Sequence, residues 1–154
     1  MKIKINVQRR DTMKLNTKIS IELDKHTYNF NTDLMRYDNL LDILQFKDTA
    51  GEEVYLHNIS KSTIHSFLTT LEILYKNSIK VSLCADYRRC LRDKGLELEF
   101  SKLYEIEDTV YLESIGFLDN KVYVLVKDTT IELDVTELKK DTNFIELIKE
   151  KYYK

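Results

Sequence analysis

One long segment of the chain has the apolar spacing of a helix, and short segments with strand-like alternation flank it on both sides. In this segment, which runs from Ser60 to Asn77, the apolar side chains recur at steps of three and four residues: Ile64, Phe67, Leu68, Leu71, Leu74 and Tyr75. Ser60 is suited to the N-cap, and Asn77 can end the helix in a left-handed conformation. A helix with a continuous apolar face must bury it against another element. The segment therefore predicts the central helix of the core.

Most of the remaining chain alternates apolar and polar residues, which is typical of strands with one buried face. Residues 17–30 predict a hairpin with a polar turn at residues 24–26. The other expected strands are an N-terminal strand and residues 53–56, 79–83, 96–100, 110–115, 122–126 and 130–135. Such a mixture of separate strands and helices predicts the α+β class.

Three shorter segments predict further helices. A helix over residues 34–44 is expected from four apolar side chains at helical steps: Leu34, Tyr37, Leu41 and Leu44. Residues 85–94 predict a helix that ends at Gly95. A C-terminal helix is expected after an Asp141 or Thr142 cap, and its inner face comprises Phe144, Ile145, Ile148 and Tyr152.

The expected elements divide the chain into two parts. Residues 1–95 would form the first domain, and residues 96–154 a β-hairpin-rich extension that ends in the C-terminal helix. Residues 19–44 and 122–148 align when one residue is inserted, and each segment is expected to form a hairpin followed by a helix. A partial internal repeat and a chance likeness explain this alignment equally well.

The order hairpin, helix, strand, helix, strand over residues 17–83 resembles the BTB/POZ superfamily, which includes potassium-channel T1 and Skp1-like domains. The residues that carry the resemblance lie mainly in and around the central helix: Leu56, Asn58, Ile59, Ser60, Phe67, Leu68, Leu71, Tyr75, Ile79 and Val81. The sequence departs from the family pattern at Asn31 or Thr32, where a histidine is common, and at Asn77-Ser78, where a glycine is common. The resemblance implies a BTB/POZ-like core of short strands and helices, followed by a β-rich segment and a C-terminal helix.

The resemblance also implies a non-enzymatic module for protein–protein interaction, either self-associating as a homo-oligomer or acting as an adaptor on a cullin-type scaffold. An alternative is a viral or phage accessory factor that binds and neutralises a host protein. This alternative arises because the absence of proline and the abundance of Lys, Ile, Asn and Tyr are typical of AT-rich genomes. Both readings predict an intracellular, cytoplasmic protein (in the host cytoplasm if it is viral).

Composition and spacing argue against several other classes. A net charge of −2 supplies no positive field for a nucleic acid or a membrane surface. No apolar run approaches the roughly 20 residues that span a bilayer, and no secretory signal is expected. The glycines Gly51, Gly95 and Gly116 are too scattered for a phosphate-binding loop. The two cysteines and three histidines lack metal-ligand spacing, so neither a metal nor another cofactor is expected.

The densest positive cluster supplies the candidate partner-binding residues. Tyr87, Arg88, Arg89 and Arg92 lie on the helix expected over residues 85–94. Arginine presents a planar set of donors that suits phosphates or an acidic partner helix. The alternative is a solvated helix face. Carboxylate pairs such as Glu105 and Glu107 alternate with apolar residues, which favours solvent-facing strand positions, and no catalytic residue is predicted.

Overall fold

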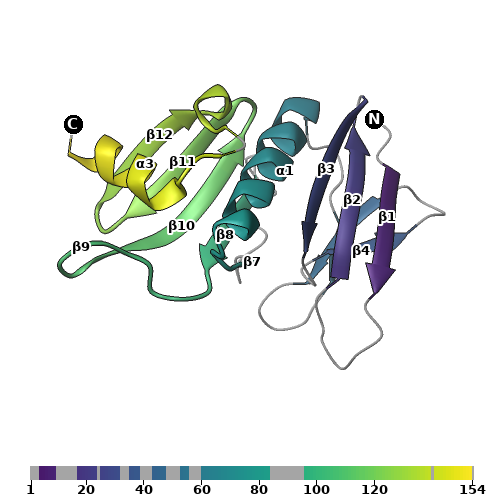
Figure 1. Cartoon of the computed structure of the whole chain (residues 1–154), viewed down its shortest axis with the longest axis horizontal. Coiled ribbons are helices and arrows are strands. Elements are labelled where there is room, and N and C mark those ends of the chain that lie inside the picture. Colours follow the sequence, from purple (N-terminus) through teal and green to yellow (C-terminus); the bar gives the residue numbers. More distant parts are fainter. Residues whose placement is uncertain are drawn as a thin grey trace.

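The protein belongs to the α+β class, and its central helix lies between two β-sheets (Figure 1). The structure is a computed structural model. It describes residues 4–9, 17–23, 25–31, 35–38, 43–47, 53–55, 60–83, 96–139 and 141–153. The helix α1 (Lys61–Lys76) contacts the first sheet of the chain, through β3 (His26–Asn31), on one side. On its other side it contacts the larger sheet formed after α1, through β10 (Val110–Leu118) and β11 (Lys121–Val126). The central helix predicted from the sequence is thus confirmed.

The larger sheet has six antiparallel strands in the order β12-β11-β10-β8-β7, with β9 paired to the start of β10. Its strands are β7 (Val81–Leu83), β8 (Leu96–Phe100), β9 (Glu105–Glu107), β10 (Val110–Leu118), β11 (Lys121–Val126) and β12 (Thr129–Asp134). The strands expected at residues 79–83, 96–100, 110–115, 122–126 and 130–135 are confirmed. The domain boundary expected at residue 95 lies between β7 and β8 in the sequence, and these two strands pair with each other. The expected boundary therefore separates two neighbouring strands of one sheet.

Two smaller antiparallel sheets precede α1 in the chain. Strands β1 (Lys4–Arg9), β2 (Thr17–Leu23) and β3 (His26–Asn31) form the first, in that order. Strands β4 (Met35–Asp38), β5 (Ile43–Lys47) and β6 (Glu53–Tyr55) form the second. The hairpin predicted over residues 17–30 is confirmed.

The helix expected over residues 34–44 is wrong, since this part of the chain contains the paired strands β4 and β5. Tyr37 and Leu44, which were expected on one helix face, lie opposite each other in that pair. Strand β6 pairs with β5 and extends the pair to three strands. The backbone N–H and C=O groups of this segment thus form hydrogen bonds between strands, and not within a short helix. The first of the two aligned segments, residues 19–44, therefore lacks the helix that it was expected to share with the second, residues 122–148.

The two ends of α1 have defined caps. The Ser60 side chain accepts a hydrogen bond from the Thr63 N–H at 3.2 Å. At the other end the Ile79 N–H donates to the Leu74 carbonyl and the Ser78 N–H to that of Tyr75, which is the Schellman arrangement. The left-handed residue is Ser78, with φ of 60°, and not Asn77, whose φ is −86°. The sequence prediction placed the end of the helix correctly but assigned the left-handed conformation one residue too early.

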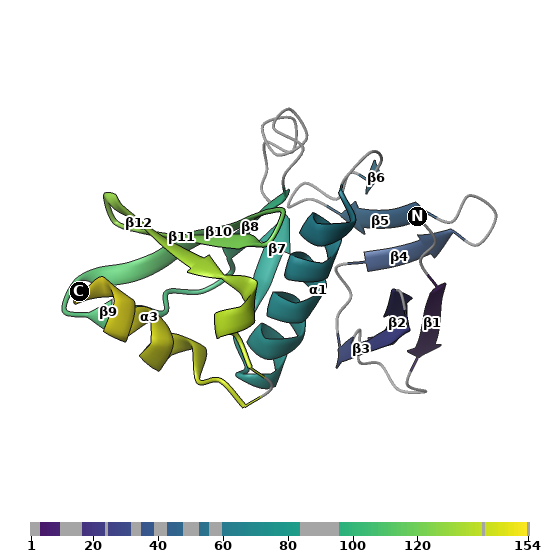
Figure 2. The ribbon, with the colours of Figure 1, turned by 90° about the horizontal axis from the view of Figure 1, so that it is seen from above.

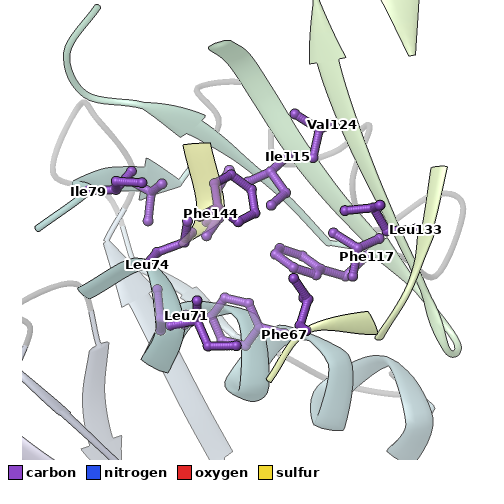
Figure 3. Packing of buried hydrophobic residues seen from close by; sticks show 14 of the residues in the cluster. Phe67, Leu71, Leu74, Ile79, Ile115, Phe117, Val124, Leu133 and Phe144 are labelled. Atoms are coloured by element: carbon purple, nitrogen blue, oxygen red, sulfur yellow. The ribbon is translucent and has the colours of Figure 1, made fainter. Parts of the chain in front are cut away.

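The core lies between α1, the C-terminal helix α3 (Phe144–Tyr152) and one face of the six-stranded sheet (Figure 3). Phe67 of α1 meets Phe117 of β10 edge to face, with ring centroids 5.5 Å apart. Phe144 of α3 is fully buried and lies near Phe100 of β8. Figure 2 shows both helices and the larger sheet from a second direction. The other side of α1 faces β3, where Tyr75 stacks on Phe30.

The C-terminal helix is capped by Asn143, and not by Asp141 or Thr142. The Asn143 side chain accepts a hydrogen bond from the Glu146 N–H at 3.2 Å. Thr142 has another role, because its hydroxyl accepts from the Lys139 N–H and its carbonyl accepts from the Asn77 side chain. Asn77 therefore connects the end of α1 to the start of α3.

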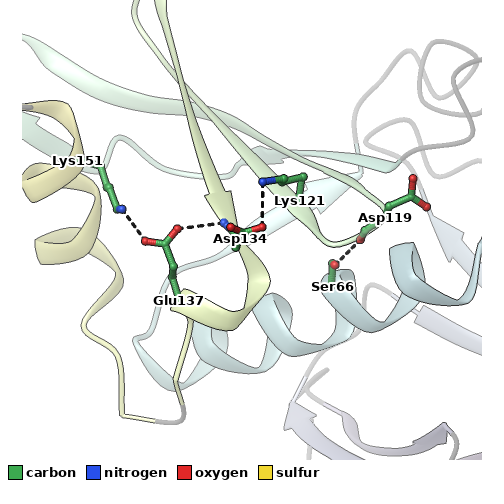
Figure 4. Close-up of polar contacts among 6 residues, drawn as sticks. All are labelled: Ser66, Asp119, Lys121, Asp134, Glu137 and Lys151. Carbon is green, nitrogen blue, oxygen red and sulfur yellow. Dashed lines mark hydrogen bonds and ion pairs between the residues drawn. The ribbon is translucent and has the colours of Figure 1, made fainter.

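Polar contacts fix the turn between β10 and β11 onto the start of α1 (Figure 4). The Asp119 N–H donates to Thr63 Oγ1 at 2.7 Å, and Ser66 Oγ donates to the Asp119 carbonyl. The hydroxyls of Ser60 and Ser62 donate to the Asp119 carboxylate. These bonds satisfy the buried hydroxyls of Thr63 and Ser66, which would otherwise destabilise the helix–sheet interface.

Candidate interaction surface

A depression of about 500 Å³ lies at the end of the six-stranded sheet where β10 begins. Three stretches of chain meet there: the loop from β8 to β9, the start of β10, and the turn between β11 and β12. Its lining residues are Phe100, Ser101, Lys102, Leu103, Thr109, Tyr111, Leu112, Glu113 and Lys127. We call this surface the β8–β9 depression.

Hydrogen bonds hold the β8–β9 loop in place on both sides. The Ser101 N–H donates to the Lys80 carbonyl at 2.9 Å, and the Lys80 N–H donates to the Tyr104 hydroxyl at 2.8 Å. The Leu112 N–H donates to the Tyr104 carbonyl at 2.9 Å. The loop residues between these contacts are thus presented from a fixed frame, as binding loops on a rigid scaffold commonly are.

Leu103 is the most exposed large apolar side chain in the described part of the chain, at 78% of its full exposure. It projects from the loop while its neighbours pack inward: Phe100 meets Tyr104 edge to face at 6.1 Å, and Leu112 is buried. Leu103 therefore contributes little to the core. Exposed apolar groups beside a polar rim are typical of interaction sites when they gather in one place.

Two lysines reach the depression from separate loops, Lys102 from the β8–β9 loop and Lys127 from the β11–β12 turn. Among the described residues neither side chain forms an ion pair. Glu113 is the one carboxylate in the lining. The depression therefore presents donors and positive charge around an apolar centre.

The backbone is strained at two residues of the lining. Thr109 has φ of 65° and Lys127 has φ of 55°. For residues other than glycine the left-handed region costs about 1–2 kcal/mol, and a β-branched threonine is rare there. Both residues lie in two-residue turns between paired strands, where the hairpin geometry requires a left-handed conformation. The two turns thus bring Thr109 and Lys127 to the depression in a defined conformation.

The carboxylates of β9 have structural or solvent-exposed positions, and the described residues contain no cluster suited to a metal ion. No group of three or more His, Cys, Asp or Glu side chains in them could hold a metal ion. Glu107 accepts a hydrogen bond from the Tyr153 hydroxyl, which ties β9 to the end of α3, while Glu105 is exposed. In the same part of the chain no helix is long and apolar enough to cross a membrane.

A second cluster of titratable groups lies between β3 and α1. The Tyr28 hydroxyl contacts His65 Nδ1, and the rings of His26 and His65 have centroids 6.0 Å apart. Burial, together with the neighbouring His26, holds the pKa of His65 below its ordinary value of 6.5. Tyr28 is buried, so this contact is part of the packing of the N-terminal sheet on α1.

The stability of the protein is expected to fall as the pH drops below 6.5, the ordinary pKa of the His65 side chain. In that range the unfolded chain binds a proton on residue 65 before the folded protein does, so protonation favours unfolding. Urea denaturation of wild type and His65→Gln over this range measures the effect. The wild type should lose stability relative to the variant as the pH falls, and a difference that does not change with pH would contradict it.

The residues predicted to bind a partner, Tyr87, Arg88, Arg89 and Arg92, lie outside the described residues, as does the helix expected over residues 85–94. The sequence interpretation did not identify Lys102, Leu103 or Lys127 as a site. One signal was available, because Leu103 follows the polar pair Ser101-Lys102 and interrupts an otherwise polar turn. Comparisons of the chain with known protein families, curated proteins and solved structures gave no match.

Proposed function

We propose that the protein is a protein-interaction module, self-associating or adaptor-like, with no catalytic step of its own, and that it binds its partner at the β8–β9 depression. The observation that carries this proposal is the exposed Leu103 in a concave, fixed and partly positive surface. Binding energy at protein interfaces is concentrated in a few side chains that become fully desolvated on binding. Leu103 is placed to become one of them.

The BTB/POZ-like core remains a finer proposal that rests on the sequence resemblance. Residues 53–83 have the strand–helix–strand order that the resemblance implies, in β6, α1 and β7. Strands β4 and β5 pair with each other where the resemblance implies a helix, and this weighs against the assignment. The partners that go with it are a second copy of the chain or a cullin-type scaffold in the cytoplasm.

Replacing Leu103 with Ser is expected to weaken partner binding about tenfold or more without changing the fold. Truncation of one of the few side chains that dominate an interface costs about 2 kcal/mol or more of binding energy, and about 1.4 kcal/mol already corresponds to a factor of ten. An exposed substitution leaves the free energy of unfolding within about 0.5 kcal/mol. Light scattering across a concentration series measures self-association. Titration with the partner isolated on immobilised wild-type protein measures adaptor binding.

The matched control is Leu118→Ser at the opposite end of β10. Leu118 is also a partly exposed leucine, but it lies beside the turn that docks on α1 and away from the depression. Binding should survive in this variant. A protein that stays monomeric and isolates no partner would contradict the proposed function, and equal binding by wild type and Leu103→Ser would contradict the proposed site.

A further inference from the structure

We infer that the β8–β9 depression recognises a short extended segment of a partner protein in which apolar side chains flank acidic ones. This inference rests on the proposed function and adds the chemistry of the partner. It combines three properties of the depression: its charge, its apolar centre and its shape.

The charge of the lining is opposite to that of the chain. The whole protein has a net charge of −2, yet the lining contains Lys102 and Lys127 against the single carboxylate of Glu113. Asp108 and Asp128, the chain neighbours of Thr109 and Lys127, are not part of the lining. A carboxylate that enters the depression would gain charge-assisted hydrogen bonds from two lysines that have no ion pair among the described residues.

The apolar part of the depression selects against a purely polar ligand. Leu103 is exposed beside the half-buried side chains of Phe100 and Tyr111. A leucine-sized group that covers Leu103 would remove apolar surface of both partners from water, at about 25 cal/mol for each Å². A partner segment with apolar residues on both sides of its acidic ones can place an apolar side chain against Leu103 and, at the same time, a carboxylate near Lys102 and Lys127.

The shape of the depression favours a peptide segment over a nucleic acid. Its volume of about 500 Å³ matches that of ordinary ligand pockets and accommodates a few side chains. A nucleic acid would need a continuous basic stripe, whereas the lining of the depression contains two lysines, from separate loops. An extended backbone could also use the hydroxyls of Ser101 and Thr109 as donors.

The test is a titration of the isotope-labelled full chain, followed by NMR, with a blocked Leu-Glu-Glu-Leu peptide and its Leu-Gln-Gln-Leu counterpart. The acidic peptide is expected to bind at least about tenfold more tightly, since loss of one charge-assisted hydrogen bond is worth about 1.5 kcal/mol. Shifts should be confined to residues of the depression. The advantage of the acidic peptide should fall as salt is added.

Two neutral substitutions separate recognition from folding. Lys102→Gln and Lys127→Asn should each remove most of the preference for the acidic peptide. Asparagine tolerates the left-handed conformation that residue 127 adopts, so this variant should be at least as stable as wild type. Lys139→Gln, an exposed lysine outside the lining, is the control for loss of one charge and should keep the preference.

Equal binding of the two peptides, shifts outside the depression, or no shift at all would overturn the inference about partner chemistry. Tighter binding of a short oligouridine at the same residues would overturn it in favour of a nucleic acid. If partner binding is still lost in Leu103→Ser while both peptides fail to bind, the proposed function stands and only the chemistry of the partner is wrong.

Discussion

A fragment of residues 96–154 is expected to remain unfolded in isolation, although it contains five of the six strands of the larger sheet and the whole of α3. The reason is that α1, which lies outside the fragment, covers much of the apolar face of that sheet. Phe67, Leu71 and Leu74 are fully buried, and Phe67 packs directly on Phe117 (Figure 3).

The free energy of the apolar burial that the fragment loses with α1 is comparable to the whole stability of a domain. Each fully buried large apolar side chain contributes about 1.5–3 kcal/mol, so these three contribute about 5–9 kcal/mol together. The complete stability of a typical domain is only about 5–15 kcal/mol. The fragment also loses β7 and the polar contacts that hold the Asp119 turn. A fragment of about 60 residues is marginal even with a complete core, so the core that remains is not expected to keep it folded.

Circular dichroism and urea denaturation of the fragment measure the result, with a fragment of residues 60–154 as the matched control. The control keeps α1, all six strands and α3, and exposes only the side of α1 that contacts β3. It should show a cooperative transition at reduced stability, whereas the shorter fragment should show none. A cooperative transition in the shorter fragment would establish the domain boundary predicted at residue 95 and contradict the role of α1 as a shared core element.

The sequence predicted α1 well because several independent signals agreed. Apolar side chains recur at helical steps over four turns, and Ser60 caps the start. The alternation in β10, β11 and β12 was equally clear, since each of these strands buries one face. In these segments the local pattern and the tertiary environment favour the same structure, so a single sequence is enough.

The same reasoning was wrong for residues 34–44 because a short apolar pattern fits both a helix and a strand pair. Leu34, Tyr37, Leu41 and Leu44 have helical spacing, yet Met35–Asp38 and Ile43–Lys47 form the paired strands β4 and β5. Pairing with β6 decides the outcome, and β6 lies several residues further along the chain. Spacing within the segment contains no information about that partner.

The candidate site could not be predicted for a related reason. Its lining comes from residues 100–103, 109, 111–113 and 127, and only the register of β8, β10 and β11 brings these segments to one end of the sheet. The strained turns at Thr109 and Lys127 are also invisible in the sequence, because neither residue type indicates a left-handed backbone. The exposed Leu103 was the one local signal.

Replacing Phe67 with Ala is expected to lower the free energy of unfolding by about 3–5 kcal/mol. Phe67 is fully buried at the centre of α1 and packs edge to face on Phe117. The substitution removes a large apolar side chain and leaves a cavity between two rigid elements that cannot close around it. The corresponding fall in Tm is roughly 6–20 °C for a chain of this size. Urea and thermal denaturation measure both quantities.

The control and a double-mutant cycle separate burial from a general effect of truncation. Leu103→Ala also removes a large apolar side chain, but from an exposed position, and should change stability by less than about 0.5 kcal/mol. Combining Phe67→Ala with Phe117→Ala should cost less than the sum of the two single changes, because the ring pair contributes about 0.5–1.5 kcal/mol beyond burial and is lost only once. Strict additivity would mean that the two rings do not interact energetically. Equal effects of Phe67→Ala and Leu103→Ala would contradict the placement of α1 between the sheets, on which the positions of the sheet and its depression depend.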